Sequence, residues 1–280
     1  MKRLAPLLTL ALLGCGLAAP RSAESVTDGV GRARFETRAA GSDLVEVTVL
    51  FPANDDGSLR GKSLPAVVFV QGGFVATSRY EWQAIELAKA GYVVALAENQ
   101  WQLAFFSLDA NQAARALLVT PPSGSVLVGA VDANRIAVAG HSLGSVSAMK
   151  LALEGDFQAV VLEAGYPDTA DDSKLPAFAR PSLSLAGTLD CSARLADVQS
   201  GWAKLPSPTA LVTLDGVTHY QFTDSQKEDE QKGCTPTLSL ETAHTRIAQA
   251  LLAFLDSALS DGTVNKAAFN QVGGATVEVR

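Results

Sequence analysis

The sequence predicts an α/β fold, in which a mostly parallel, doubly wound sheet is flanked by helices. Short apolar runs alternate with helical patterns along the chain, and this alternation is typical of parallel sheets covered on both faces. Near the middle, the mainly apolar residues 135–139 lead through a glycine-rich turn into a helical stretch at 146–154. The 280 residues are enough for one domain with a large core.

The expected elements cover most of the chain. Alternating apolar residues predict a half-buried strand at 45–51 that pairs with 33–37. Buried strands are expected at 66–70, 92–96, 159–162, 182–186 and 210–214. Helices are expected at 78–90, opened by a capping box of Ser78 and Glu81, at 109–118, and at 247–259. For residues 275–279 an edge strand and a frayed end both stay open. We therefore expect one domain over 30–260 and a tail over 261–280.

The charge balance and the N-terminus limit the partners and the location. The net charge of −7 argues against nucleic acid and anionic membrane surfaces as partners. Lys2 and Arg3 form a basic head, and the apolar residues 4–13 are too short to span a bilayer. With the small residues that follow, this pattern predicts a signal peptide over 1–19 and therefore an exported protein, secreted or periplasmic.

Two processing routes fit this signal peptide. Residues 12–15, Leu-Leu-Gly-Cys, resemble a bacterial lipoprotein box, which would place a lipid on Cys15 and anchor the protein to a membrane. Cleavage after Ala18 or Ala19 would instead release a soluble protein. Apart from a possible lipid on Cys15, nothing in the sequence predicts contact with a membrane.

The remaining cysteines are Cys191 and Cys234. An even number of cysteines in an exported protein favours a disulfide between them, although two free buried thiols remain the alternative. The sequence contains no His-Glu-x-x-His, paired Cys-x-x-Cys or Gly-x-Gly-x-x-Gly motif. We therefore expect no metal and no cofactor.

The turn at 140–144, Gly-His-Ser-Leu-Gly, predicts a nucleophilic serine. A tight strand-to-helix turn pushes Ser142 out of the sheet, and the flanking glycines supply the room that its backbone needs. The amide of Leu143 then points at the place where an oxyanion would form. The five-residue motif alone would also fit a structural turn, but the strand before it and the helix after it favour a catalytic serine.

A serine hydroxyl needs a base, and the chain has three histidines. His219 lies in the loop after the strand at 210–214, at the carboxyl end of the sheet where Ser142 also lies. It is the expected base. His244, at the start of the last helix, is the weaker candidate. His141 is expected to line the site or to pack beside it.

The base needs a carboxylate that holds its tautomer and stabilises the imidazolium. Asp190 follows the strand at 182–186 and is the expected acid. Glu163, at the end of the strand at 159–162, is the second candidate. Asp215 precedes a glycine and is expected to be a turn residue.

A second oxyanion donor is expected from the turn that closes the strand at 66–70, Gln-Gly-Gly-Phe. The amide of Phe74 is the first candidate and that of Gly73 the alternative, unless the segment is only a turn. Phe74, Tyr80 and Trp82 are candidate substrate-binding wall residues near it, with His141.

The chain order Ser142, Asp190, His219 resembles that of the α/β-hydrolase superfamily, as do the serine turn at 140–144 and the glycine turn at 71–74, here called the early glycine turn. The resemblance covers roughly 45–259. The short layout resembles bacterial secreted esterases grouped with chlorophyllases, platelet-activating-factor acetylhydrolases and polyester hydrolases. Two features depart from the common pattern: Gln71 replaces a histidine before Gly72, and Ser145 stands where a third glycine is frequent. The resemblance implies an α/β-hydrolase fold and a serine hydrolase that cleaves a small-molecule or polymeric ester through an acyl-enzyme.

Two other functions remain open, a peptidase or amidase on the same fold and a non-catalytic binding protein. The segment 164–181 is too short for a large cap domain and too polar for a lipid-docking lid, and 223–233 is equally polar. We therefore expect an open groove and a preference for short acyl chains.

Overall fold

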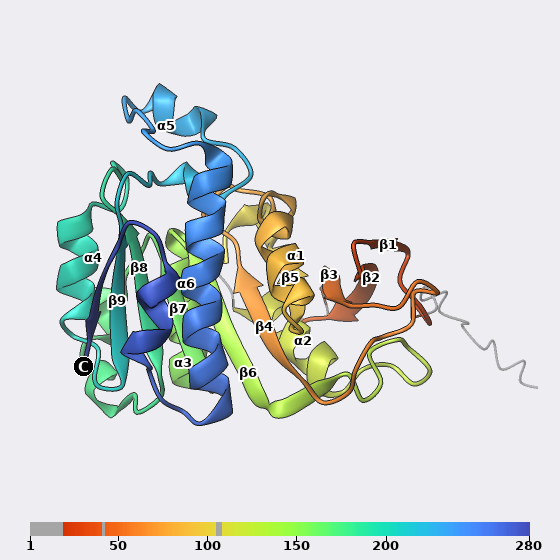
Figure 1. The fold of residues 1–280 in the computed structure, drawn as a ribbon. Helices are drawn as coiled ribbons and strands as arrows, with labels where there is room; N and C mark the ends of the chain where they lie inside the picture. The colour runs from red at the N-terminus through yellow and green to blue at the C-terminus, as the bar shows by residue number, and fades with distance from the viewer. Residues whose placement is uncertain (1–18, 41–42, 105–107) are drawn as a thin grey trace, which may run out of the picture.

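The computed structural model describes residues 19–40, 43–104 and 108–280. The lipoprotein box, Cys15 and nearly all of the predicted signal peptide lie outside the described residues. Ten strands form one sheet in the order β1-β2-β3-β5-β4-β6-β7-β8-β9-β10 (Figure 1). The mostly parallel sheet and its flanking helices confirm the predicted α/β fold.

The sheet has an antiparallel margin at each end and a parallel centre. One margin consists of β1 (Ser25–Thr27), β2 (Val30–Arg38) and β3 (Leu44–Pro52), and β3 pairs with β5. The parallel centre consists of β4 (Leu64–Val70), β5 (Val93–Ala97), β6 (Val131–His141), β7 (Ala159–Glu163), β8 (Ser182–Gly187) and β9 (Thr209–Leu214). β10 (Ala275–Val279) pairs antiparallel with β9. Residues 275–279 are thus an edge strand, one of the two alternatives left open by the sequence.

Helices cover both faces of the sheet (Figure 1). One face carries α1 (Glu81–Lys89) and α6 (Leu240–Ser260), and the other carries α2 (Asp109–Val119), α3 (Leu143–Glu154) and α4 (Leu195–Trp202). The short helix α5 (Lys227–Gln231) lies at the end of the molecule where α6 begins. Single 3₁₀ turns occupy Thr77–Tyr80, Gln100–Gln102, Thr169–Asp171, Leu175–Ala177, Tyr220–Phe222 and Lys266–Gln271.

Each face of the sheet has its own apolar core, because side chains alternate along the strands. In β4, Val68 and Val70 face the α2–α3–α4 side, whereas Val67 and Phe69 face the α1–α6 side. The apolar stripe predicted for the last helix is buried over its whole length: Ile247, Leu251, Phe254, Leu255 and Leu259. Burial of each such side chain contributes about 1.5–3 kcal/mol, and this holds the long helix against the sheet.

Two predicted helix starts were wrong. The capping box of Ser78 and Glu81 does not form, because a 3₁₀ turn precedes α1 and the helix begins at Glu81 with no side-chain cap. The turn is anchored instead by Thr77, whose backbone N–H and hydroxyl both donate to the Glu98 carboxylate. The helix after the serine begins at Leu143 rather than at residue 146. It therefore starts directly at the serine.

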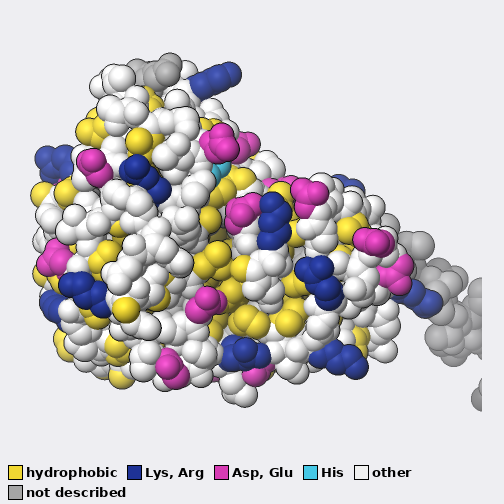
Figure 2. Space-filling model, in the orientation of Figure 1, with side chains coloured by type: hydrophobic (Ala, Val, Ile, Leu, Met, Phe, Trp, Pro, Cys, Tyr) yellow, Lys and Arg dark blue, Asp and Glu magenta, His cyan; other side chains and the backbone are white. Residues whose placement is uncertain are grey.

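The described residues contain no large cap domain over the carboxyl ends of the strands. The segment between β7 and β8 forms only the 3₁₀ turns Thr169–Asp171 and Leu175–Ala177. Within the described part of the chain, no helix is long and apolar enough to cross a membrane. On the face that carries α1 and α6, basic and acidic side chains are interspersed (Figure 2).

Candidate active site

Ser142 occupies a strained turn between β6 and α3, which we call the elbow (residues 140–144). Its backbone has φ 57° and ψ −123°, in a region that residues with a side chain rarely adopt. The glycines on either side are required by close backbone contacts. A Cβ on Gly140 would lie 2.2 Å from the Gly144 carbonyl oxygen, and a Cβ on Gly144 would lie 2.3 Å from the Val70 carbonyl oxygen. The strain at Ser142 is thus maintained by packing that only glycine permits.

Hydrogen bonds to β7 hold the elbow in place. The Ser142 N–H donates to the Glu163 carbonyl oxygen at 2.8 Å. The fully buried Ser145 hydroxyl lies 2.6 Å from the Gly140 carbonyl oxygen and 2.9 Å from that of Glu163. A glycine at 145 could not make these contacts. Ser145, which stands where the family often has a third glycine, therefore ties the elbow to β7.

The structure brings the predicted nucleophile, base and acid together. The Ser142 Oγ lies 3.0 Å from His219 Nε2, and His219 Nδ1 lies 2.8 Å from Asp190 Oδ2. Asp190 Oδ1 accepts the N–H groups of Ser192 and Ala193, both at 2.7 Å. Because an ionised carboxylate only accepts, Nδ1 carries the imidazole proton and Nε2 is left to accept the serine proton.

The three residues of the site differ in their exposure to solvent. His219 and Asp190 are nearly buried, whereas Ser142 is half-buried. His219 and Asp190 are therefore shielded from water, while Ser142 remains within reach of a ligand at the carboxyl ends of the strands.

His141 packs beside the site rather than lining it, which is one of the two positions expected for it. It is 1 % exposed. Its Nε2 lies 3.1 Å from the His219 carbonyl oxygen and its Nδ1 lies 2.9 Å from the Tyr80 hydroxyl. Since a carbonyl only accepts, Nε2 carries the proton and Nδ1 accepts from Tyr80. Burial, followed by the nearby His219, lowers the pKa of His141 well below its ordinary value, so the ring stays neutral.

Tyr80 is fully buried, so it cannot form a substrate wall as predicted. Its hydroxyl accepts the Gly72 N–H at 3.0 Å and donates to His141. Burial raises its pKa above the ordinary value. The chain of contacts from Gly72 through Tyr80 and His141 to His219 connects the early glycine turn with the loop of the base.

Trp82 packs elsewhere, and its predicted place beside the glycine turn was also wrong. Its ring stacks on His244 with the centroids 3.5 Å apart and the planes 3° apart. Both residues line a surface groove between α1 and α6. His244 Nε2 lies 2.8 Å from the Thr223 carbonyl oxygen. Of the three histidines, all within the described ranges, only His219 has a hydrogen bond to Ser142.

The early glycine turn lies against the elbow. A Cβ on Gly73 would lie 2.6 Å from Leu143 Cδ1. The N–H of Leu143 opens α3, so it has no acceptor within the helix, and the positive end of the helix dipole favours an anion there. The Phe74 N–H, the first candidate for a second donor, instead donates to the Gln102 carbonyl oxygen at 2.9 Å. No partner within the described residues accepts from the Gly73 N–H, which favours the alternative, Gly73.

Gln71 holds this glycine turn where the family more often has a histidine. Its side-chain nitrogen donates to the Val75 carbonyl oxygen at 3.0 Å, and its side-chain oxygen accepts the Asn99 N–H at 3.2 Å. The buried amide therefore braces both ends of the turn and links it to the loop after β5.

Glu163, the second candidate acid, faces away from the base. Its Oε2 accepts the Gln83 side-chain N–H at 2.9 Å, and its Oε1 has no partner among the described residues. Complete burial raises the pKa of Glu163 to about 8. The carboxyl group is therefore neutral at pH 7 and contacts α1, while Asp190 contacts His219.

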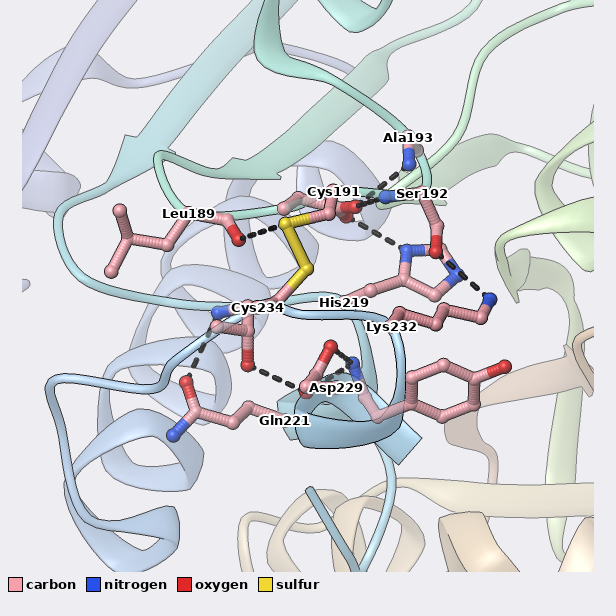
Figure 3. The surroundings of a disulfide bond; sticks show 12 residues. Leu189, Cys191, Ser192, Ala193, His219, Gln221, Asp229, Lys232 and Cys234 are labelled. Carbon is pink, nitrogen blue, oxygen red and sulfur yellow. Dashed lines mark hydrogen bonds and ion pairs between the residues drawn. A yellow bond between two sulfur atoms is a disulfide. The ribbon is translucent and has the colours of Figure 1, made fainter. Parts of the chain in front are cut away.

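The disulfide between Cys191 and Cys234 is present, as the sequence predicted, with the Cα atoms 6.1 Å apart (Figure 3). It joins the residue after Asp190 to the segment that follows the base. Asp229 lies in that segment and was missed from the sequence, because it stands in a charged run that is typical of a solvated helix. In the described part of the chain, no cluster of three or more His, Cys, Asp and Glu side chains could hold a metal ion.

Comparison with known proteins agrees with this arrangement at the level of the family. The profile of the alpha/beta hydrolase family matches residues 66–243. This range includes the elbow, Asp190 and His219, and it spans more than half of the chain. No curated protein matches the sequence. By its fold and by this match, the chain belongs to the alpha/beta hydrolase family.

Proposed function

We propose that this hydrolase is a serine esterase that cleaves carboxylic esters through an acyl-enzyme. The observation that carries the proposal is the continuous contact from Ser142 Oγ to His219 Nε2 at 3.0 Å and from His219 Nδ1 to Asp190 at 2.8 Å. A nucleophile, a base within hydrogen-bond reach and a group that orients the base are the parts that this chemistry requires.

In the proposed reaction, His219 Nε2 takes the hydroxyl proton as Ser142 Oγ attacks the ester carbonyl carbon. Asp190 stabilises the imidazolium that forms, and the N–H groups of Leu143 and Gly73 donate to the oxyanion. The tetrahedral intermediate then expels the alcohol, which receives the proton from His219. Water attacks the acyl-enzyme with the same base and releases the acid. Loss of one oxyanion donor typically costs about 10²–10³ in kcat.

The surroundings of Ser142 support an apolar substrate. Four exposed apolar side chains follow the carboxyl ends of β4, β6, β7 and β8, three of them on loops and Leu143 at the start of α3. We call them the apolar rim: Phe74, Leu143, Tyr166 and Leu189. Such exposed apolar groups favour binding of an apolar acyl or alcohol portion. Because no cap domain covers the site within the described residues, we propose a preference for short acyl chains, with room for a bulky or polymeric alcohol portion.

An ester and an anilide with the same acyl group separate esterase from amidase activity. We expect faster turnover of the ester, and equal or faster turnover of the anilide would favour the peptidase or amidase alternative. Graded acyl lengths, measured below and above the solubility limit of each ester, test the rest. A preference for long chains or a jump in rate at the solubility limit would contradict the open site.

Export is the second part of the proposal. The disulfide Cys191–Cys234 is consistent with an oxidising compartment. Expression in a bacterium, followed by intact-mass analysis of the processed protein, distinguishes the routes. Cleavage after Ala18 or Ala19 gives an unmodified soluble chain, whereas processing before Cys15 adds the mass of the lipid.

A further inference from the structure

Asp229 is a buried carboxylate beside the base that the reaction above does not use. It lies in α5 and is fully buried. Its Oδ2 accepts the Thr218 hydroxyl at 2.7 Å and the Tyr220 N–H at 3.0 Å. These two donors belong to the residues immediately before and after His219. The side chain therefore binds the backbone of the base from both sides.

The hydrogen bonds of Asp229 fit an ionised carboxylate, because both of its oxygens lie within reach of the Tyr220 N–H, which only donates, and Oδ2 also accepts the Thr218 hydroxyl. Burial raises the pKa of Asp229, and the hydrogen bonds from Thr218 and Tyr220 oppose that rise. A buried carboxylate is costly unless it is well hydrogen-bonded. Its position next to His219 thus places a second anion, besides Asp190, near the imidazolium that forms during the reaction.

The segment that carries Asp229 is anchored rather than loosely attached. The Cys234 N–H donates to the Asp229 carbonyl oxygen at 2.9 Å, and Cys234 is bonded to Cys191, next to Asp190 (Figure 3). On the other side, Arg79 binds the carboxylates of Asp224 and Glu228. The position of Asp229 is therefore fixed relative to both the acid and the base.

We propose that Asp229 is a positioning residue for His219, an inference that rests on the proposed esterase function. By holding Thr218 and Tyr220, it keeps His219 Nε2 within 3.0 Å of Ser142 and Nδ1 within 2.8 Å of Asp190. A displacement of about 1 Å at a reacting group can lower a rate 10²-fold. Its charge also stabilises the protonated form of the base.

Other ionisable groups lie near the His219 ring. The neutral His141 ring lies 4.6 Å from the His219 ring, and the Tyr220 ring lies 5.3 Å from it. Lys232, which follows α5, is a nearby cation, and its Nζ lies 4.9 Å from the centre of the Tyr220 ring. With Asp190 unchanged, removal of the Asp229 charge leaves one anion beside the imidazolium. The acid limb of the pH profile, the range in which acidification lowers kcat/KM, must then move to lower pH.

Asp229→Asn is the test, with Asp224→Asn as the matched control on the same segment. Asp224 is half exposed and shares Arg79 with Glu228, so the contact between Glu228 and Arg79 still anchors the segment when Asp224 is replaced. For Asp229→Asn we expect kcat on a butyrate ester to fall about 10- to 100-fold, with KM within about twofold and the acid limb at lower pH. For Asp224→Asn we expect kcat within about twofold of wild type and an unmoved acid limb. Wild-type kcat and acid limb in Asp229→Asn, or equal losses in both variants, would overturn the proposal.

A second variant covers the case in which Asp229→Asn does not fold, as judged by circular dichroism and gel filtration. Thr218→Val removes one hydrogen bond to Asp229 but keeps its charge. We expect about a threefold or larger loss of kcat, with KM and the acid limb unchanged, and wild-type kcat would overturn the positioning role.

Ser142→Ala separates the proposed role of Asp229 from the proposed esterase function. If it retains activity, the esterase function fails, whereas Ser142-dependent activity with a wild-type-like Asp229→Asn rejects only the role of Asp229.

Discussion

The elbow and the segment that carries the base (residues 215–239, here the base segment) are built by different means. The elbow depends on backbone contacts that exclude any Cβ at Gly140 and Gly144. The base segment depends on its own Asp229 and on contacts with distant parts of the chain, namely Arg79 and the disulfide to Cys191. Ser142 is thus positioned mainly by tight backbone packing, and His219 by side-chain contacts and a disulfide.

The elbow and the base segment should therefore differ in how well they tolerate substitutions. A tight backbone turn has no side chain that can relax, so a single added methyl group disturbs it. The base segment is held by several polar contacts and one covalent bond, so loss of one contact should shift the base without unfolding the sheet. The predictions below test that contrast, from the largest expected effect to the smallest.

Replacement of the base should have the largest effect. His219→Ala should lower kcat/KM about 10³- to 10⁵-fold, because the serine loses its proton acceptor, while the melting temperature changes little. His244→Ala is the control, since His244 stacks on Trp82 away from Ser142, and it should stay within about threefold in activity. Steady-state kinetics on a butyrate ester measure both, and the reverse pattern would reassign the base to His244.

Glu163 lies under the elbow and should make stability depend on pH. Its pKa is raised from 4.5 to about 8 in the folded protein, so the folded state keeps a proton that the unfolded state releases. The stabilisation is fully present below pH 4.5 and is lost as the pH rises to about 8, by up to about 5 kcal/mol. Glu163→Gln should remove this loss, because an amide can pair with Gln83 and does not ionise.

Urea unfolding between pH 4.5 and 9 measures this effect. The free energy of unfolding of Glu163→Gln minus that of wild type should rise across the window and then level off above pH 8. A constant difference over the whole range would show that Glu163 is not protonated in the folded protein.

A methyl group in the elbow should destabilise the fold and remove activity together. Gly144→Ala would place its Cβ 2.3 Å from the Val70 carbonyl oxygen and 2.5 Å from that of Gln71, and we expect a loss of about 3 kcal/mol. Gly273→Ala is the control, because nothing lies within 4 Å of its Cβ position. Thermal unfolding compares the two, and equal melting temperatures would contradict the tight packing of the elbow.

Loss of a rim side chain should have the smallest effect. Phe74→Ala removes a ring that is 74 % exposed and leaves the backbone N–H in place. We expect KM for a butyrate ester to rise about two- to fivefold with kcat nearly unchanged. A large loss of kcat would instead show that Phe74 shapes the oxyanion site and would reopen the choice between Phe74 and Gly73.

The sequence predicted what local pattern determines. Apolar runs located the strands, and the elbow followed from glycines placed between a strand and a helix. Asp190 and His219 could be placed because both follow strands whose carboxyl ends meet at one edge. The fold class and the meeting of these residues with Ser142 were therefore accessible without coordinates.

The sequence was not sufficient where contacts between distant residues determine the arrangement. It does not show that the Gln102 carbonyl accepts the Phe74 N–H, the contact that favours Gly73 as the second oxyanion donor. Tyr80 and Trp82 stand two residues apart at a helix start, and only the fold shows that one is enclosed and the other stacks on His244. Asp229 could not be found, because a charged run is most often solvated and its burial depends on the disulfide-linked base segment.

The central claim is that Ser142 is the nucleophile, and a fluorophosphonate probe tests it most directly. Wild-type protein should gain the mass of one probe on the peptide that contains Ser142, in step with the loss of ester hydrolysis. Ser142→Ala should take up no probe and should hydrolyse the ester at least about 10⁴-fold more slowly. Labelling at another residue, or wild-type turnover by Ser142→Ala, would contradict the account.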